Sequence, residues 1–318
     1  MARSTHRNLA VPDASVQGAT AVSGRPMGSV AFNLFLALRP GQWTKNFLVF
    51  AGLIFAERLF DRQAVLTAIE AFGIFCALSG GVYLVNDIAD RETDRQHPVK
   101  SRRAIASGLV PVRVAILTAV LLIGGAIGAA FLINTPFGLV AVAYAALQAL
   151  YSGPLKHIVI IDVLTLAIGF VLRAVGGAVA IDVSISHWLL VCTILLALFM
   201  ALAKRRHELV LLADGATGHR PILGEYSPYL LDQMIAVVTA STLIAYIFYT
   251  ISPETAQKFG TEWLGLTIPF PLYGIFRYLY LVHQREGGGS PSDLLLNDKP
   301  LLACVALWVV AVVVIIYA

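Results

Sequence analysis

Residues 64–94 join an apolar run, AVLTAIEAFGIFCALSGGVYLV (64–85), to an acidic segment, NDIADRETD (86–94). A helix needs about 20 predominantly apolar residues to cross the hydrocarbon core of a bilayer. Runs of similar length recur along the chain, which has 318 residues, 58% of them hydrophobic and 13% charged. Soluble domains average about 25% charged residues. The pattern therefore predicts an all-α polytopic membrane protein.

This composition excludes several other classes of protein. Too little of the chain is charged for a soluble enzyme, a secreted disulfide scaffold or a disordered chain. Long unbroken apolar runs, without ten-residue segments of alternating polarity, also argue against an outer-membrane barrel. The net charge of +4 is ordinary for a protein with basic cytoplasmic loops, so we expect no nucleic-acid partner.

Hydropathy divides the chain into a tail and one membrane domain. Residues 1–28 have no apolar period and no signal-peptide core, so we interpret them as a flexible tail. Residues 29–318 form the predicted transmembrane domain. Nine spans are predicted, at residues 42–60, 64–85, 114–132, 136–151, 159–181, 187–203, 232–251, 264–282 and 300–317.

Basic residues predict the orientation of these spans. Eighteen of the 23 Lys and Arg residues lie in the tail, at the entry to the first span or in loops after even-numbered spans. Only Arg58, Arg62 and Lys258 lie on the other side. Since Lys and Arg are enriched in cytoplasmic loops, we expect a multi-pass protein of the inner (cytoplasmic) membrane. Its N-terminus would be cytoplasmic and its C-terminus outside.

The acidic segment is the first candidate site. On a continuous helix, Asp87, Asp90 and Asp94 would share one stripe within an arc of about 60°. Carboxylates so close repel each other unless cations bridge them, and oxygen ligands of this kind suit Mg²⁺ with a bound phosphate. A solvated, charged loop is the alternative interpretation.

A second candidate site follows the sixth span, where the sequence reads AKRRHE (203–208). One acidic and one basic cluster suit two different anions, one held through metal and the other bound directly by Lys and Arg. A positive-inside anchor at the end of the span is the alternative.

Several segments together resemble the UbiA superfamily of membrane prenyltransferases, and within it the decaprenyl-phosphate phosphoribosyltransferase branch. The Asn-Asp-x-x-Asp-x-x-x-Asp pattern of residues 86–94 resembles the first aspartate-rich motif of that superfamily. The likeness covers residues 36–318. This sequence departs from the family pattern at Arg103-Ala104, where Arg-Pro is expected. It also departs at the second aspartate cluster, which Lys204, Arg205 and Arg206 replace here. Further matching segments are LRPGQWTKN (38–46), DRQHP (94–98) through Gly108, YSGPLKH (151–157), 162–177 with FVLRA (170–174), and NDKP (297–300).

The resemblance implies a fold and a reaction. Superfamily members have nine transmembrane helices, here expected around a central cavity open to the cytoplasmic side. The branch transfers 5-phosphoribose from phosphoribosyl pyrophosphate to a membrane polyprenyl (decaprenyl) phosphate and releases pyrophosphate. Its product feeds the synthesis of cell-wall arabinan precursors. The implied enzyme is a Mg²⁺-dependent glycosyltransferase.

The resemblance and the charges together give the expected site. Asp87, Asp90 and Asp94 would hold Mg²⁺ on the donor's diphosphate and stabilise the leaving group. The acceptor phosphate is already anionic, so no general base is required, and positioning and electrostatics would carry catalysis. The expected substrate-binding residues are Asn86, Arg39, Lys45, Lys100, Arg103, Tyr151, Lys156, Asp162, Lys204, Arg205, Arg206 and Glu208.

Arg173 lies deep in the fifth predicted span, and a charge inside the membrane usually faces a cavity or a partner. Either a structural pair, with Glu70 as the candidate partner, or a direct functional role fits this position.

Two other functions stay open. One is a prenyl diphosphate-dependent transferase with an aromatic or isoprenoid acceptor. The other is a small transporter of similar topology, which the charge concentrated on one face and the lack of a detectable inverted repeat disfavour. The sequence is compatible with a homo-oligomer and does not give the chain length of the lipid.

Overall fold

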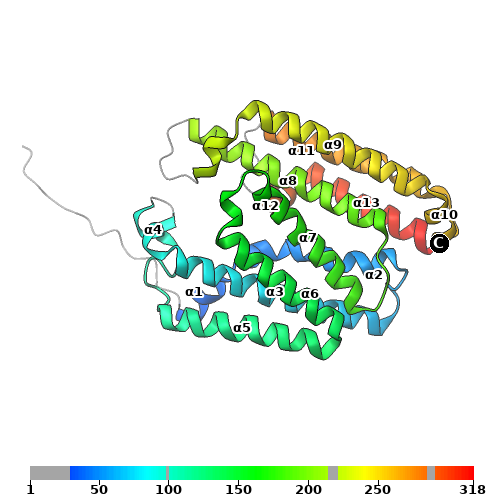
Figure 1. Cartoon of the computed structure of the whole chain (residues 1–318). Helices are drawn as coiled ribbons and strands as arrows, with labels where there is room; N and C mark the ends of the chain where they lie inside the picture. The colour runs from blue at the N-terminus through cyan, green and yellow to red at the C-terminus, as the bar shows by residue number, and fades with distance from the viewer. Residues whose placement is uncertain (1–28, 98–99, 214–220, 285–290) are drawn as a thin grey trace, which may run out of the picture.

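A computed structural model describes residues 29–97, 100–213, 221–284 and 291–318. In these ranges every regular element is an α-helix or a 3₁₀-helix (Figure 1). The expected flexible tail, residues 1–28, lies outside the described residues. The all-α prediction is therefore confirmed for the part of the chain that the structure describes.

Seven helices within these ranges are long and apolar enough to cross a membrane. Each coincides with a predicted span, namely spans two to seven and span nine. The apolar runs and the polar residues that cap the helix starts set the limits of both. Asp61, Asn134, Ser227 and Asp298 accept backbone N–H bonds at the start of their helices. The seven are α3 (Arg62–Ala89), α5 (Val112–Ile133), α6 (Thr135–Ser152), α7 (Ile161–Ala180), α8 (His187–Ala213), α9 (Pro228–Ile251) and α13 (Lys299–Tyr317).

The first and eighth predicted spans have a different structure. The first is a 3₁₀-helix, η1 (Pro40–Phe50), followed by the short α2 (Ala51–Phe55). The eighth is η5 (Trp263–Thr267) followed by α11 (Pro269–Gln284). Neither contains an α-helix of 18 residues, so nine crossings stay a prediction. The remaining short elements are α1 (Val30–Ala37), α4 (Arg91–Gln96), η2 (Lys100–Arg102), η3 (Leu155–His157), η4 (Pro221–Glu225), α10 (Pro253–Phe259) and α12 (Pro291–Asn297).

Close backbone contact with α7 fixes η1 and α2 in the bundle. A Cβ added at Gly177 would lie 1.9 Å from the carbonyl oxygen of Val49, and one added at Gly52 would lie 2.8 Å from Cα of Ala178. Only glycine permits this approach. The contact places η1, with its cations Arg39 and Lys45 nearby, beside α7.

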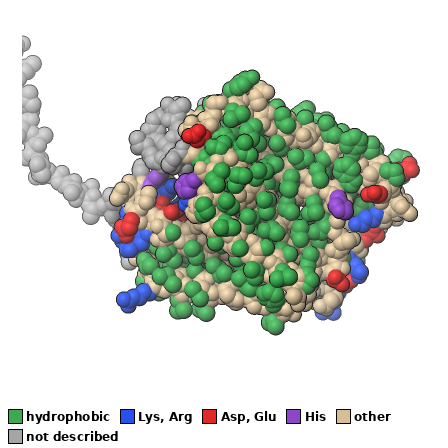
Figure 2. All heavy atoms as spheres, viewed as in Figure 1, with side chains coloured by type: hydrophobic (Ala, Val, Ile, Leu, Met, Phe, Trp, Pro, Cys, Tyr) green, Lys and Arg blue, Asp and Glu red, His purple; other side chains and the backbone are tan. Residues whose placement is uncertain are grey.

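The surface divides along the length of the bundle. Figure 2 shows hydrophobic side chains over the middle of one face, with Lys, Arg, Asp, Glu and His gathered toward its two ends. In Figure 1, α4 lies at one end, and α10 and the C-terminus lie at the other. Large apolar side chains such as Leu132 (90% exposed) and Tyr229 (74%) face outward. This arrangement suits a bilayer around the middle of the bundle.

A groove of about 790 Å³ lies between α3 and α5, and Glu70 is among its lining residues. Glu70 is exposed on this side of α3, whereas α7 packs on another side, where Phe75 lies beside Gly176. Of the two alternatives for Arg173, the structural pair with Glu70 is therefore not the one that the described residues form. The central cavity open to the cytoplasm stays a prediction.

Candidate functional site

The acidic segment lies where α3 ends. The helix stops at Ala89, the chain turns at Asp90, and α4 begins at Arg91. The expected continuous stripe of three aspartates is wrong, because the helix breaks at the second of them. Asp87 and Asp94 are buried, at 4% and 2% exposure, whereas Asp90 is exposed. Two of the three carboxylates, those of Asp87 and Asp94, are therefore buried beside this turn.

Two arginines distant in sequence contact this pair of carboxylates. Nη1 of Arg103 donates to Oδ1 of Asp87 at 3.1 Å and to Oδ2 of Asp94 at 2.6 Å. Nη2 of Arg39 donates to the same oxygen of Asp87 at 2.5 Å. Both arginine side chains keep about a third of their surface exposed. Asp87 and Asp94 thus converge on one cationic group at the rim of the bundle.

Arg39 has an unusual backbone conformation. Its φ of 56° lies in the left-handed region, which costs energy for a residue with a side chain. The guanidinium stacks 4.6 Å from the ring centroid of Tyr83, in addition to its ion pair with Asp87. These two contacts hold the strained residue against the acidic site.

The chemistry of the acidic site fits a magnesium ion. Carboxylate oxygens of Asp87 and Asp94 already share a cation, and Asn86 adjoins them in sequence. Mg²⁺ prefers one or two carboxylates together with phosphate oxygens. Within the described residues no three His, Cys, Asp or Glu side chains are grouped as metal ligands. A guanidinium nitrogen of Arg103 lies between the two carboxylates instead.

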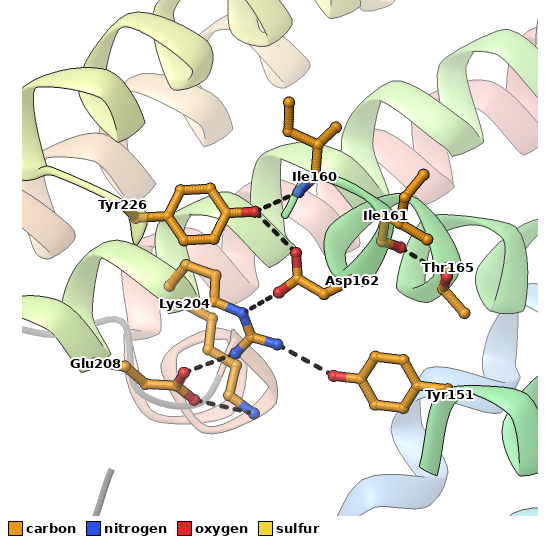
Figure 3. Close-up of polar contacts among 9 residues, drawn as sticks. Tyr151, Ile160, Ile161, Asp162, Thr165, Lys204, Glu208 and Tyr226 are labelled. Carbon is orange, nitrogen blue, oxygen red and sulfur yellow. Dashed lines mark hydrogen bonds and ion pairs between the residues drawn. The ribbon is translucent and has the colours of Figure 1, made fainter. Parts of the chain in front are cut away.

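The basic cluster at the end of α8 has a different arrangement from the one expected. Arg205 is 1% exposed, and its guanidinium donates to Asp162 at 2.7 Å, Glu208 at 2.6 Å and the Tyr151 hydroxyl at 3.1 Å (Figure 3). Asp162 is itself fully buried. Burial of an arginine requires such neutralising partners. Arg205 therefore joins the ends of α6, α7 and α8 and is not open to a phosphate.

Tyr226, which the sequence did not single out, completes this network. Its hydroxyl donates to Asp162 at 2.8 Å and accepts the N–H of Ile160 at 2.7 Å. Ile160 has a φ of 69° at the start of α7, so the hydrogen bond holds a strained turn. Burial, together with the hydrogen bond to Asp162, raises the pKa of Tyr226 to about 12. The phenol therefore stays protonated at neutral pH.

The two neighbours of Arg205 point to different partners. Nζ of Lys204 lies 3.8 Å from Glu208, and the side chain is 40% exposed. Arg206 pairs with Asp232 on α9, which His283 of α11 also contacts at 3.3 Å. Successive residues of a helix differ by about 100° in direction. Lys204 is thus the member of the expected cluster that lies at the surface beside the Arg205 network.

Three further expected residues lie on separate elements. Lys45 is half-buried on η1, Lys156 is half-buried on η3, and Lys100 is exposed on η2. No carboxylate among the described residues pairs with Lys100 or Lys156. Both cations therefore remain available to an anionic ligand.

Arg173 lies in a polar network inside the bundle. Nε donates to Asn46 at 2.7 Å, Nη1 to the Gly169 carbonyl at 2.9 Å, and Nη2 to the Tyr144 hydroxyl at 2.7 Å. Asn46 is fully buried and donates to Ser79 at 3.4 Å. The sequence signal for this network was an Asn within an apolar span. Asn46 was not among the expected site residues.

The acidic and basic sites lie at the same end of the bundle. Figure 1 places α4 and the end of α8 that leads to η4 on the side opposite α10. Among the described residues no ion pair joins Asp87 or Asp94 to residues 204–208. The structure therefore has two charged clusters at one end of the bundle, and in each cluster the arginine charges are neutralised by carboxylates of the same cluster.

Comparison with known proteins identifies relatives along nearly the whole chain. Decaprenyl-phosphate phosphoribosyltransferase of Corynebacterium glutamicum is 34% identical over 298 residues, which cover 92% of this chain and 89% of the relative. The protein of the same name from Mycolicibacterium smegmatis is 31% identical, with 92% and 95% of the two chains covered.

Solved structures show the same fold. A UbiA homolog from Archaeoglobus fulgidus bound to GPP and Mg²⁺ matches with a TM-score of 0.67 and 18% identity, covering 90% of this chain and all of that one. The profile of the UbiA prenyltransferase family matches residues 46–297, which include the acidic segment, the Arg205 network and Arg173. The chain belongs to the UbiA prenyltransferase family.

Proposed function

We propose that this protein transfers 5-phosphoribose from phosphoribosyl pyrophosphate to a polyprenyl phosphate, decaprenyl phosphate in the relatives, and releases pyrophosphate. The observation that carries the proposal is the convergence of buried Asp87 and Asp94 on a shared cation, with Arg39 beside them. This site suits a diphosphate held through metal and arginine. The names of relatives 31–34% identical support the identity of donor and acceptor.

The reaction needs little covalent help from the protein. An oxygen of the lipid phosphate forms a bond to C1 of the ribose, while the bond from C1 to the diphosphate oxygen breaks and its electron pair leaves with pyrophosphate. The lipid phosphate is ionised before it reacts, so no proton has to be removed. Catalysis then rests on positioning and on stabilising charge at the leaving group.

Asp87 and Asp94, with Asn86 and Asp90 nearby, are the residues proposed to hold Mg²⁺. When bound, the ion would neutralise charge on the leaving diphosphate. Arg103 lies between the two carboxylates and must leave them before a metal is held there. Its guanidinium and that of Arg39 then become available for bidentate contacts with the phosphate oxygens.

Cations around this site are proposed to bind the donor's 5-phosphate. Lys45, Lys100 and Lys156 lie on the 3₁₀ elements η1, η2 and η3, and Lys204 lies at the surface of α8. We assign Arg205, Asp162, Tyr151 and Glu208 a different task from the one expected. Their mutual contacts fix the ends of three helices and so position the residues around them.

The proposed setting is the cytoplasmic membrane. Seven long helices, together with η1–α2 and η5–α11 as two further crossings, would give nine spans. The positive-inside rule would then place the N-terminus and both charged clusters on the cytoplasmic side, and the C-terminus outside. The cell-wall arabinan pathway is the proposed use of the product.

A prenyl diphosphate-dependent transferase is the second candidate. The observation in its favour is the fold of solved UbiA homologs bound to GPP or DMAPP with Mg²⁺. A shared fold does not determine activity. The replacement of the second aspartate cluster by Lys204-Arg205-Arg206 weighs against this second candidate.

The experiment offers purified protein two pairs of substrates in the presence of Mg²⁺. One pair is labelled phosphoribosyl pyrophosphate with polyprenyl phosphate, and the other is labelled prenyl diphosphate with an aromatic acceptor. Label that enters the lipid only from the first pair supports the proposal. Product only from the second pair would replace it with the second candidate.

A further inference from the structure

Arg173 is a buried cation whose hydrogen-bond partners are all neutral. The residue is 6% exposed, and its guanidinium donates to an amide oxygen of Asn46, a backbone carbonyl of Gly169 and a hydroxyl of Tyr144. The rings of Tyr144 and Phe170 lie within 5.3 Å of it. No Asp or Glu among the described residues forms an ion pair with Arg173. Its charge is therefore not neutralised by the protein.

The contrast with Arg205 makes this position unusual. Arg205 is similarly buried and has two carboxylate partners, Asp162 and Glu208. A lone arginine inside a membrane helix is energetically costly. Residues of this kind usually face a cavity or a ligand pathway. A ligand that carries negative charge would supply the missing partner.

The position of Arg173 relative to the acidic site is set by α3. Its partner Asn46 also contacts Ser79, which precedes Asp87 by two helical turns, or about 12 Å along the axis. Tyr83 lies between these levels along α3, and its ring stacks against the guanidinium of Arg39. Arg173 therefore lies toward the interior of the bundle from the proposed diphosphate site, on the same side of α3.

We infer that Arg173 binds the phosphate of the polyprenyl phosphate acceptor. The inference rests on the proposed function, in which the leaving diphosphate lies at Asp87 and Asp94. In an in-line displacement the attacking oxygen approaches C1 from the side opposite the leaving group. A lipid phosphate bound at Arg173 would present its attacking oxygen from the interior of the bundle, where the lipid tail would be in apolar surroundings.

The guanidinium has donors to spare for this task. It carries five N–H groups, of which three are used by Asn46, Gly169 and Tyr144. The other two can donate to phosphate oxygens, and the three existing bonds fix the plane of the group. A neutral aromatic or alcohol acceptor would gain nothing from this charge, so Arg173 also selects a phosphorylated lipid.

Asn46→Asp separates ligand binding from a structural role. The new side chain has the same shape and places a carboxylate 2.7 Å from Nε of Arg173, where the amide oxygen lies now. If Arg173 is purely structural, this ion pair preserves or increases stability and leaves substrate binding unchanged. If Arg173 binds the lipid phosphate, the carboxylate neutralises it and repels the ligand. Asn134→Asp, at the cap of α6, is the matched control with the same change of charge.

The measurement is binding of polyprenyl phosphate, of the matching polyprenol and of Mg²⁺ with phosphoribosyl pyrophosphate to each detergent-purified protein. We expect Asn46→Asp to weaken binding of polyprenyl phosphate by about 10- to 100-fold, the worth of a hydrogen bond to a charged group. Binding of the polyprenol and the donor should not change. Arg173→Gln should give the same selective loss and replaces Asn46→Asp if that variant does not fold.

Unchanged binding of polyprenyl phosphate in both variants would overturn the inference. So would a loss confined to the donor, which would assign Arg173 to the ribose 5-phosphate. If wild-type protein binds polyprenyl phosphate through Arg173 but transfers no ribose phosphate, the inference stands and the proposed reaction fails.

Discussion

Replacement of Asp162 by Asn tests whether Arg205 is a structural cation. The structure buries Asp162 completely and leaves Arg205 at 1% exposure, with 2.7 Å between the carboxylate and Nε. Asn keeps the shape of the side chain and can still accept a hydrogen bond, but it removes one negative charge. Arg205 then depends on Glu208 alone for charge neutralisation.

Loss of one partner of a buried ion pair destabilises a protein by about 3–5 kcal/mol. Glu208 remains 2.6 Å from Nη1 of Arg205, so we expect the lower end of that range, about 3 kcal/mol. The Glu208 side chain is 26% exposed. Glu208→Gln therefore serves as a milder comparison, with an expected cost of about 1.5 kcal/mol.

The assay is unfolding by a denaturing detergent in mixed micelles, followed by loss of helical signal, for wild type and both variants. Donor binding is measured on the same samples. A cost below about 1 kcal/mol for Asp162→Asn would refute the structural role, because such a cost is below that of breaking a buried pair. Tighter donor binding in Asp162→Asn would show instead that the freed Arg205 binds a phosphate.

Three further outcomes are expected from the packing and capping contacts. Gly177→Ala should destabilise the protein by about 3 kcal/mol and lower its thermal midpoint, since the new Cβ would meet the Val49 carbonyl. The control Gly73→Ala, whose Cβ would meet no atom within 4 Å, should not lower the midpoint. Because the pKa of Tyr226 is raised to about 12, its contribution to stability should be complete below about pH 10 and lost as pH rises toward 12. A difference between wild type and Tyr226→Phe that stays constant from pH 8 to 11.5 would contradict this. Asp298→Ala should cost about 1–2 kcal/mol in detergent unfolding, because it removes the cap of α13; an unchanged midpoint would count against the cap.

Sequence patterns predicted the long helices well and the irregular ones poorly. Apolar runs bounded by caps such as Asn134 and Ser227 gave seven helices at the expected places. The first predicted span differs because its conformation depends on contact with Gly177 of a distant helix. Hydropathy reports how apolar a segment is and carries no information on such backbone contacts.

The candidate site was predicted by residue type more accurately than by arrangement. Asp87, Asp94 and Arg103 were all expected, and the structure joins them. The turn at Asp90 was missed, because the acidic run has no Gly or Pro to mark a break. Arg205 was expected to face a ligand because positive charge in the sequence does not reveal which distant carboxylates will surround it.

Tyr226 had no sequence signal, since an aromatic residue near a membrane helix is most often an interfacial anchor. Its role depends on a contact across 66 residues with a strained backbone N–H at Ile160. The Arg173 network likewise joins η1, α6 and α7. Side chains that converge from separate helices become a site only through the packing of the whole bundle.

We propose that Asp87 and Asp94 hold the diphosphate of a donor whose 5-phosphoribose is transferred to a lipid phosphate. The most direct measurement follows label from phosphoribosyl pyrophosphate into the organic phase, for wild type and Asp87→Asn, with Mg²⁺ and after its removal by a chelator. We expect labelled lipid from wild type with Mg²⁺ and at least about 100-fold less from the other samples. Equal transfer by Asp87→Asn, or no lipid label from folded wild-type protein, would contradict it.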